Sequence, residues 1–192
     1  MIIPVKTSKQ VKQFIYFIKD LYKDDPYYVY PIFHVQKKEL TDLLLHQKTY
    51  KALLYMKNDQ VLGRLLFTYD YSKKQDKTIC YFSYFDCINN QEVASALLSY
   101  MEADMRAQKI SYSEGTFSPF DPDTRRGILV KGFEQDPSIF TSYNYDYYPT
   151  LLEHYGYKKA IDTILINALV NETTRKKLNT FSKFFLRKND VR

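Results

Sequence analysis

The 192-residue sequence has no tryptophan, five glycines and two cysteines. So few glycines leave little material for a glycine-rich phosphate-binding loop. The cysteines, Cys80 and Cys87, lie in one apolar segment at an odd separation. This spacing places them on opposite faces of a strand and predicts no disulfide between them. Two unpaired cysteines are typical of a reducing compartment.

Long apolar runs are also missing, and the first residues show no signal-peptide pattern. We therefore expect a cytoplasmic protein with no membrane partner. The three histidines, His34, His46 and His154, are scattered, and neither cysteine has ligand spacing to any of them. The sequence accordingly predicts no metal site.

Charge is only mildly unbalanced, with 28 basic against 22 acidic residues, a net charge of +6 and a pI of about 9.0. This balance suits an anionic ligand. No block of like charge is long enough for a nucleic-acid-binding arm, so nucleic acid is a disfavoured partner.

Apolar residues make up 45% of the chain, which is enough for a packed core in one domain. Aromatic residues make up 17%, and 19 of them are tyrosines. Because each buried tyrosine hydroxyl needs a partner, we expect several tyrosines to line a cleft or the rim of the core.

The segment from Cys80 to Leu98 changes its apolar period from that of a buried strand to that of a helix. Asn89 or Asn90 precedes the helical pattern as an N-cap. A central strand that runs directly into a helix exposes unpaired backbone N–H groups, which attract phosphate. The competing interpretation is a plain strand-to-helix connection that binds nothing.

The rest of the chain predicts a mixed α/β fold in which hairpin strands come first and crossover helices follow. Gly63 indicates a bulge or a close backbone approach, and Gly156 should close a helix. Strands are expected at about 1–5, 50–56, 60–71, 110–116 and 159–170. Helices are expected after Ser8 up to Asp24, and at about 35–45, 146–155 and 172–187.

Three local patterns carry a family resemblance: VLGR at 61–64, the strand and helix at 85–98, and LEHYGY at 152–157. With them the chain resembles the GNAT superfamily of acyl-CoA N-acyltransferases. More narrowly, CYFSYFDCINNQEVASALL, GILVKGF and YNYDYYPTLLEHYGYKKAID are similar to a bacterial GNAT-like subgroup of poorly assigned function.

The resemblance implies a mixed central sheet flanked by helices on both faces. It covers residues 1–170 as a GNAT-like domain. Residues 171–192 then form a C-terminal helix that leads to a missing last strand or to a second region.

The resemblance also implies acyl-CoA, and specifically acetyl-CoA, as the cofactor. Its pyrophosphate would lie against the strand end and helix start formed by Phe85, Cys87, Asn89, Asn90, Gln91, Glu92 and Val93. Two departures from the superfamily pattern stand out. The turn at 87–92 has no glycine, and Leu152 occupies a position where the family often has a tyrosine that acts as general acid toward the CoA thiolate. A GNAT-like binding module without catalysis is therefore the alternative function, and a nucleic-acid-associated protein is a less favoured one.

Transfer of an acyl group to an amine needs a base for the amine and an acid for the departing thiolate. Asp86 and Glu114, near the ends of neighbouring strands, are candidate bases; alternatively they are a helix cap and a rim charge. Tyr147 and Tyr148 are candidate acids. We expect Tyr148→Phe to cut kcat at least about ten-fold with nearly unchanged stability.

The acceptor cleft should be walled by Tyr143, Asn144, Tyr147 and Tyr148 on one side and by Asp86 and Glu114 on the other. Asn144 could instead cap the following helix. The acceptor is a small-molecule amine or a peptide, attacked directly in a ternary complex. The oligomeric state stays open, with a homodimer as one option.

Overall fold

The computed structural model describes residues 1–122, 126–166 and 171–189. The chain divides into two compact units, Met1–Lys158 and Lys159–Arg192, and each is described by itself.

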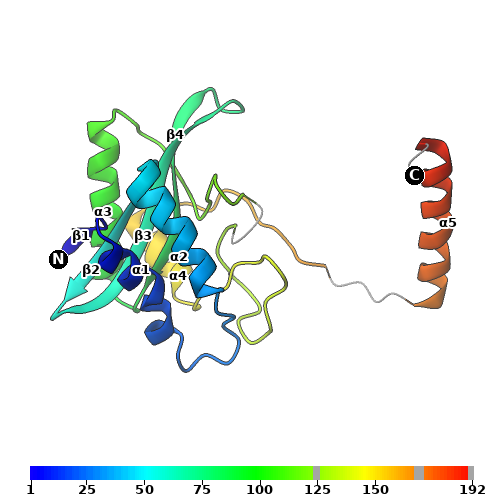
Figure 1. Cartoon of the computed structure of the whole chain (residues 1–192), viewed down its shortest axis with the longest axis horizontal. Coiled ribbons are helices and arrows are strands. Elements are labelled where there is room, and N and C mark those ends of the chain that lie inside the picture. The colour runs from blue at the N-terminus through cyan, green and yellow to red at the C-terminus, as the bar shows by residue number, and fades with distance from the viewer. Residues whose placement is uncertain (123–125, 167–170, 190–192) are drawn as a thin grey trace. The chain divides into compact units, whose positions relative to one another are not determined.

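A five-stranded mixed sheet forms the centre of the first unit, in the order β1-β2-β3-β4-β5 (Figure 1). Successive strands pair antiparallel, except that β4 and β5 are parallel. The turn between β2 and β3, Asn58–Asp59, has positive φ angles of 49° and 60°, as expected for a hairpin turn that matches strand twist. The strands are Ile2–Pro4 (β1), Lys51–Lys57 (β2), Gln60–Ser72 (β3), Lys77–Cys87 (β4) and Ser113–Gly115 (β5).

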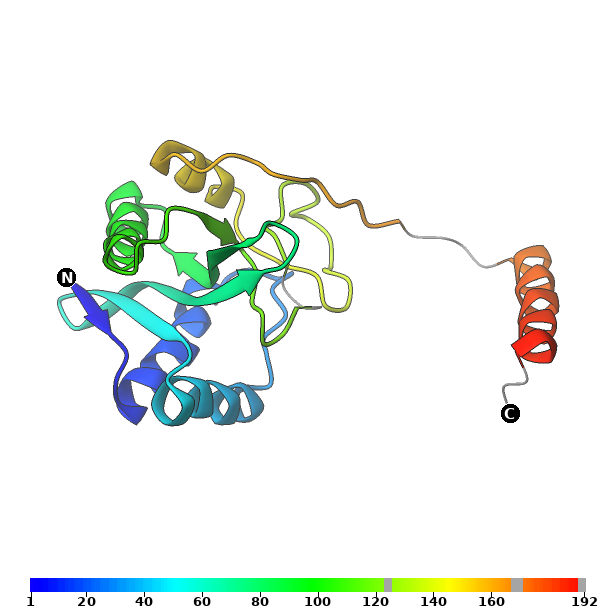
Figure 2. The same cartoon turned by 90° about the horizontal axis from the view of Figure 1, so that it is seen from above.

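Helices cover both faces of this sheet (Figure 2), which confirms the predicted fold class. One face packs against α1 and α2, and the other against α3 and α4. A π-helical turn at Asp42–Gln47 follows α2 directly. The helices are Ser8–Leu21 (α1), Phe33–Thr41 (α2), Gln91–Ala107 (α3) and Tyr148–Tyr155 (α4).

Two helix starts illustrate how local sequence fixes these elements. Asn90 is the N-cap of α3, and its side chain accepts hydrogen bonds from two backbone N–H groups. The cap of α1 is Thr7, one residue before the predicted Ser8, because Thr7 and Gln10 complete a capping box. Gly156 closes α4 with a φ of 115°, as predicted.

A bulge in β4 overturns the prediction that Cys80 and Cys87 lie on opposite faces. Both thiols are free and buried in the core cluster on the α3 side. Between Arg64 and Leu66 of β3, the partners on β4 jump from Asp86 to Ser83, so β4 carries one extra residue. Because that residue reverses the side-chain alternation, an odd separation ends on the same face.

The predicted last strand, residues 159–170, is also corrected. Residues 159–166 belong to no strand, and residues 167–170 lie outside the described residues. Apolar, β-branched residues form a strand only where a neighbour takes up their backbone groups. Here Ile161, Ile164 and Ile166 are all more than 80% exposed.

The second unit also contains α5, Glu172–Asn189, which agrees with the predicted helix. Within the described residues, no helix combines the length and the apolar character needed to cross a membrane.

Candidate functional site

The site begins where β4 and β5 separate. Their parallel pairing runs from Cys80 with Ser113 to Phe82 with Gly115. One further backbone hydrogen bond joins Phe117 N to Phe82 O at 2.8 Å, and β4 then continues to Cys87 alone on this side among the described residues. Such a split in a sheet leaves room between the strand ends for a ligand.

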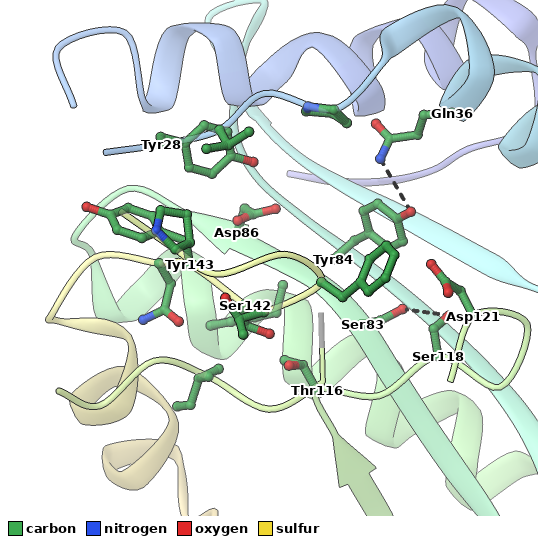
Figure 3. A pocket seen from close by; sticks show the side chains of 18 of the residues that line it. Tyr28, Gln36, Ser83, Tyr84, Asp86, Thr116, Ser118, Asp121, Ser142 and Tyr143 are labelled. Atoms are coloured by element: carbon green, nitrogen blue, oxygen red, sulfur yellow. Dashed lines mark hydrogen bonds between the residues drawn. The ribbon is translucent and has the colours of Figure 1, made fainter. Parts of the chain in front are cut away.

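A cavity of about 580 Å³ opens at this split, a size typical of small-molecule sites (Figure 3). Its floor comes from residues 83–86 of β4, and its facing wall from the chain after β5. The segments 28–39 and 137–144 complete the lining together with Arg64 of β3 and Tyr148 of α4. Four segments that are distant in sequence therefore meet at the bulge of β4.

Tyr84 lies within the bulge of β4 and has an unusual backbone conformation. It has a positive φ of 50°, which is uncommon for an aromatic residue. Its ring lies 5.2 Å from the Arg64 guanidinium carbon, and its hydroxyl accepts a hydrogen bond from Gln36 Nε2 at 3.4 Å. The bulge thus brings an aromatic side chain into the cavity at a point where regular alternation would not.

A buried ion pair lies beneath the cavity. Arg64 Nε and Nη2 contact Asp86 Oδ2 at 2.7 and 2.6 Å, and Nη1 donates to Phe14 O at 2.8 Å. Arg64 is only 1% exposed. Burial by itself would lower the pKa of Arg64, but attraction by Asp86 outweighs it and the pKa is raised. Arg64 therefore stays charged and holds the Asp86 carboxylate in place.

The other oxygen of that carboxylate binds two tyrosines. Asp86 Oδ1 accepts from Tyr22 at 3.2 Å and from Tyr148 at 3.3 Å, and the two hydroxyls are 3.0 Å apart. The Tyr148 oxygen also accepts from Cys87 N at 3.2 Å. Burial first, and then the charge of Asp86, raises the pKa of both tyrosines well above its usual value. Both hydroxyls consequently keep their protons at neutral pH.

The open edge of β4 is covered by α4. Tyr147 donates to Cys87 O at 2.8 Å, so both backbone groups of Cys87 are bound to tyrosine hydroxyls. Tyr147 is half-buried, and burial raises its pKa. The side chains of Phe85, Cys87 and Val93 lie in the apolar core, so these three predicted cofactor residues can offer a ligand mainly backbone groups.

The start of α3 decides how well the chain fits the pyrophosphate of acyl-CoA. The Asn90 oxygen accepts from Glu92 N at 2.8 Å and from Val93 N at 3.2 Å. Gln91 reaches Leu151 O through Nε2 at 3.1 Å, while its buried Oε1 has no partner among the described residues. A pyrophosphate fits this helix start when the Asn90 side chain rotates away and releases two backbone donors.

Of the remaining predicted site residues, Tyr143 and Asn144 line the cavity and Glu114 does not. Tyr143 lines the cavity, and its hydroxyl lies 3.0 Å from both oxygens of Asp25. Asn144 does not cap α4, whose N-cap is Tyr147. Instead, Asn144 accepts from Leu129 N at 2.7 Å and donates to Leu129 O at 3.2 Å. Glu114 lies outside the described lining.

Asp86, Tyr148, Tyr143 and Asn144 are thus brought together around one cavity. Arg64, Tyr22 and Gln36 also belong to the site, although no role was predicted for them. A charged residue between Gly63 and Leu65, in an otherwise apolar strand, was the available signal for Arg64. Tyr22 and Gln36 give no such signal, because only the tertiary fold places them.

Sequence comparison finds one informative relative. The protein YghO of Escherichia coli K12 is 29% identical over 165 residues, which is 82% of this chain and 41% of the relative. The chain thus spans about two fifths of the length of the curated relative that it matches. No protein-family profile matches the chain.

Several solved structures with similar folds are acetyltransferases. An aminoglycoside acetyltransferase from an uncultured soil sample, in complex with sisomicin, has a TM-score of 0.55 at 10% identity and covers 89% of this chain and 96% of its own. A predicted acetyltransferase from Clostridium acetobutylicum, in complex with acetyl-CoA, has a TM-score of 0.54 at 10% identity, over 87% and 96% of the two chains. An aminoglycoside N-acetyltransferase in complex with CoA gives 0.56 at 10% identity, over 88% and 93%. From the sheet, its split and these likenesses, we conclude that the chain has the fold of the GNAT acetyltransferases.

Proposed function

We propose that the chain is an acyl-CoA-dependent N-acyltransferase that moves an acyl group, acetyl in the simplest case, to an amine bound in the cavity. One observation carries the proposal: the cavity opens at the split of β4 and β5, directly beside the strand end that leads into α3. An acceptor bound in the cavity and an anion bound at the start of α3 would then both lie beside the C-terminal end of β4. This arrangement suits direct attack in a ternary complex.

Acyl-CoA would be held by backbone groups at residues 89–93, and when bound it supplies an activated thioester. The Tyr148 hydroxyl is the proposed proton donor, because it lines the cavity and carries a proton at neutral pH. Tyr147 is the neighbouring candidate.

Asp86 has a supporting role in this proposal. Its carboxylate is bound by Arg64 at 2.6 Å and by the hydroxyls of Tyr148 and Tyr22, so Asp86 serves to orient these two tyrosines. Glu114 has no proposed role, because it lies outside the described cavity lining.

The acceptor is proposed to be a small-molecule amine, with a peptide as the alternative. Aminoglycosides are a natural first panel, since a structural neighbour was solved with sisomicin.

A binding module without catalysis is the second candidate. The observation that favours it is the Asn90 side chain, which occupies two donors at the start of α3, together with the negative charge of Glu92 in the first turn. Both features oppose a pyrophosphate.

Two measurements on the whole chain separate these candidates. Isothermal titration with acetyl-CoA tests the cofactor site, and an amine panel with acetyl-CoA tests turnover. Acyl transfer to any amine supports the enzyme. Ligand binding in the cavity without acetyl-CoA binding or turnover supports the module.

A further inference from the structure

Exposed apolar side chains gather at the mouth of the cavity. Val29 and Ile32 lie on the segment before α2 and Val35 in its first turn, whereas Ile139 and Phe140 lie on the segment between β5 and α4. All five line the cavity, and between 41% and 81% of each residue is exposed. Single exposed apolar residues are common on protein surfaces, but a group of them around one opening indicates a site that binds an apolar ligand.

The fold, and not the local sequence, assembles this apolar mouth. Its two parts, residues 29–35 and 139–140, are more than a hundred residues apart in the chain. Among the described residues of the first unit, the exposed large apolar residues outside the lining are spread over separate elements and loops: Met1, Tyr71, Tyr100, Tyr112 and Val130. The grouping is therefore a property of the cavity and not of the surface in general.

Several polar side chains of the lining give their hydrogen bonds to the protein itself. Ser83 donates to Ser118 Oγ at 3.4 Å (Figure 3), and Thr141 donates to a backbone carbonyl at 2.7 Å. Asn144 Nδ2 donates to Leu129 O at 3.2 Å. A ligand rich in hydroxyl groups would compete with these bonds, so the lining favours apolar contact over hydrogen bonding.

The buried end of the cavity is polar, in contrast to its mouth. Asp86 and Tyr148 are buried, and both line the cavity beside the C-terminal end of β4. One end of the lining thus offers a carboxylate and a hydroxyl, and the other end offers aliphatic and aromatic side chains. This distribution matches a ligand with a polar head and an apolar tail.

We propose that the cavity binds the straight alkyl chain of a single-chain amphiphile, whose polar head lies beside Tyr148 and whose chain leaves between residues 29–35 and 139–140. The chain belongs either to the amine acceptor or to the acyl group of acyl-CoA. Both sources present the same chemistry to the apolar mouth, and binding measurements distinguish them. The inference deepens the proposed function, on which it rests for the head as the place of acyl transfer.

Isothermal titration of the whole chain with butylamine, octylamine and glucosamine measures what the alkyl chain contributes. Full burial of one methylene group tightens binding about four-fold, so octylamine should bind at least about ten-fold more tightly than butylamine even when burial is partial. Glucosamine, an amine that carries hydroxyl groups, should bind more weakly than octylamine. Binding of glucosamine as tight as that of octylamine would contradict a chain on the acceptor.

A second pair of ligands, acetyl-CoA and octanoyl-CoA, assigns the chain to its source. With the chain on the acceptor, which is the expected result, amine affinity rises with chain length and the two thioesters bind alike. With the chain on the acyl group, octanoyl-CoA binds at least about ten-fold more tightly than acetyl-CoA, and the alkylamines bind alike. Independence from chain length in both series would mean that the apolar mouth serves another partner, and it would overturn the proposal.

Variants of the mouth tie the effect to the named residues. Ile32→Ser and Ile139→Ser each remove an exposed apolar side chain from one of the two segments, and each should weaken binding of the longer-chain ligand at least about three-fold. Val130→Ser is the matched control, because Val130 is similarly exposed but lies outside the described lining, and it should change nothing.

Equal effects of all three variants would overturn the proposal, because the alkyl chain would then not lie between the two segments. Thermal unfolding of each variant checks that the fold is intact. Since the amine series contains no CoA, a failed dependence on chain length and a failed acyl transfer are separate results.

Discussion

In the first half of β4, Lys77–Phe82, the strand pairs with β3, and from Cys80 onward it also pairs with β5. In the second half, residues 83–87, it keeps β3 but loses β5, and a bulge interrupts the remaining ladder. Side chains take over the role of backbone pairing there, since tyrosine hydroxyls bind Cys87 and an ion pair anchors Asp86. The comparison shows that the site exists because ordinary pairing stops in the middle of one strand.

The largest expected effect comes from breaking the ion pair under the open half. Arg64→Met leaves the buried Asp86 carboxylate without its cation and should lower the free energy of unfolding by about 3–5 kcal/mol. Urea unfolding of the variant measures this loss.

The double variant Arg64→Met/Asp86→Leu serves as control, because it removes both charges and should recover most of the lost stability. A double variant as unstable as the single one would mean that shape, and not the unpaired charge, causes the loss.

The second effect concerns the hydroxyls that replace backbone pairing. Tyr148→Phe should reduce kcat at least about ten-fold, the lower edge of losses seen when a general acid is removed. It should also cost about 1–3 kcal/mol of stability, because Cys87 N and Asp86 each lose a buried partner. This revises the sequence-based expectation of nearly unchanged stability.

Tyr22→Phe is the matched control, since its hydroxyl belongs to the same network. It should lower stability without an equal loss of kcat. If Tyr147→Phe lowers kcat and Tyr148→Phe does not, the proton donor is Tyr147.

A smaller effect is expected at the start of α3, just beyond the open half. Asn90→Asp keeps the cap but adds a negative charge, whereas Glu92→Gln removes one. Charges at a helix N-terminus are worth about 0.3–1 kcal/mol, so acetyl-CoA affinity should fall about two- to five-fold in the first and rise similarly in the second. Isothermal titration compares them. Identical affinities in both variants would place the pyrophosphate elsewhere.

The smallest effect compares the two halves through their thiols. Burial first, and then Asp104, raises the pKa of Cys80 to about 12, and burial first, and then Asp86, also raises that of Cys87. Neither thiol should react with a thiol reagent at pH 8 until the structure opens locally. In single-cysteine variants, Cys87 should be labelled faster than Cys80. Local unfolding of residues 83–87 breaks fewer backbone hydrogen bonds, because this half of β4 pairs with β3 alone. Equal labelling rates would show that the halves open together.

Much of the fold could be predicted because it depends on local signals. The Asn58–Asp59 turn, the Asn90 cap and the Gly156 helix end each follow from nearby residues. Gly63 was predicted to allow a close approach, and a Cβ there would lie 2.8 Å from Val93. Long-range features could not be read in the same way.

The β4 bulge is the clearest example of what sequence reasoning missed. Alternation within one strand says nothing about the residue count of its partner, so the shared face of Cys80 and Cys87 was invisible. The same holds for the site: Asp86 and Tyr148 were predicted from position, but Tyr22 reaches them across more than sixty residues of chain. The prediction of a strand at residues 159–166 was wrong for a related reason, because a strand requires a neighbouring strand to pair with.

The extra residue of β4 changes which side chains of the strand face the core: even-numbered residues do so before the bulge, and odd-numbered residues do so after it. Upstream of Ser83 the even-numbered Cys80 and Phe82 face α3, and downstream of Tyr84 the odd-numbered Phe85 and Cys87 do. Deleting a single residue between these pairs would restore regular alternation, so Asp86 and Cys87 would keep their faces, but the bulge that brings Tyr84 into the cavity would be lost. In any related sequence, a deletion within residues 83–85 should therefore matter more to the cavity than to the core, because it removes the bulge and leaves the apolar face of β4 in place.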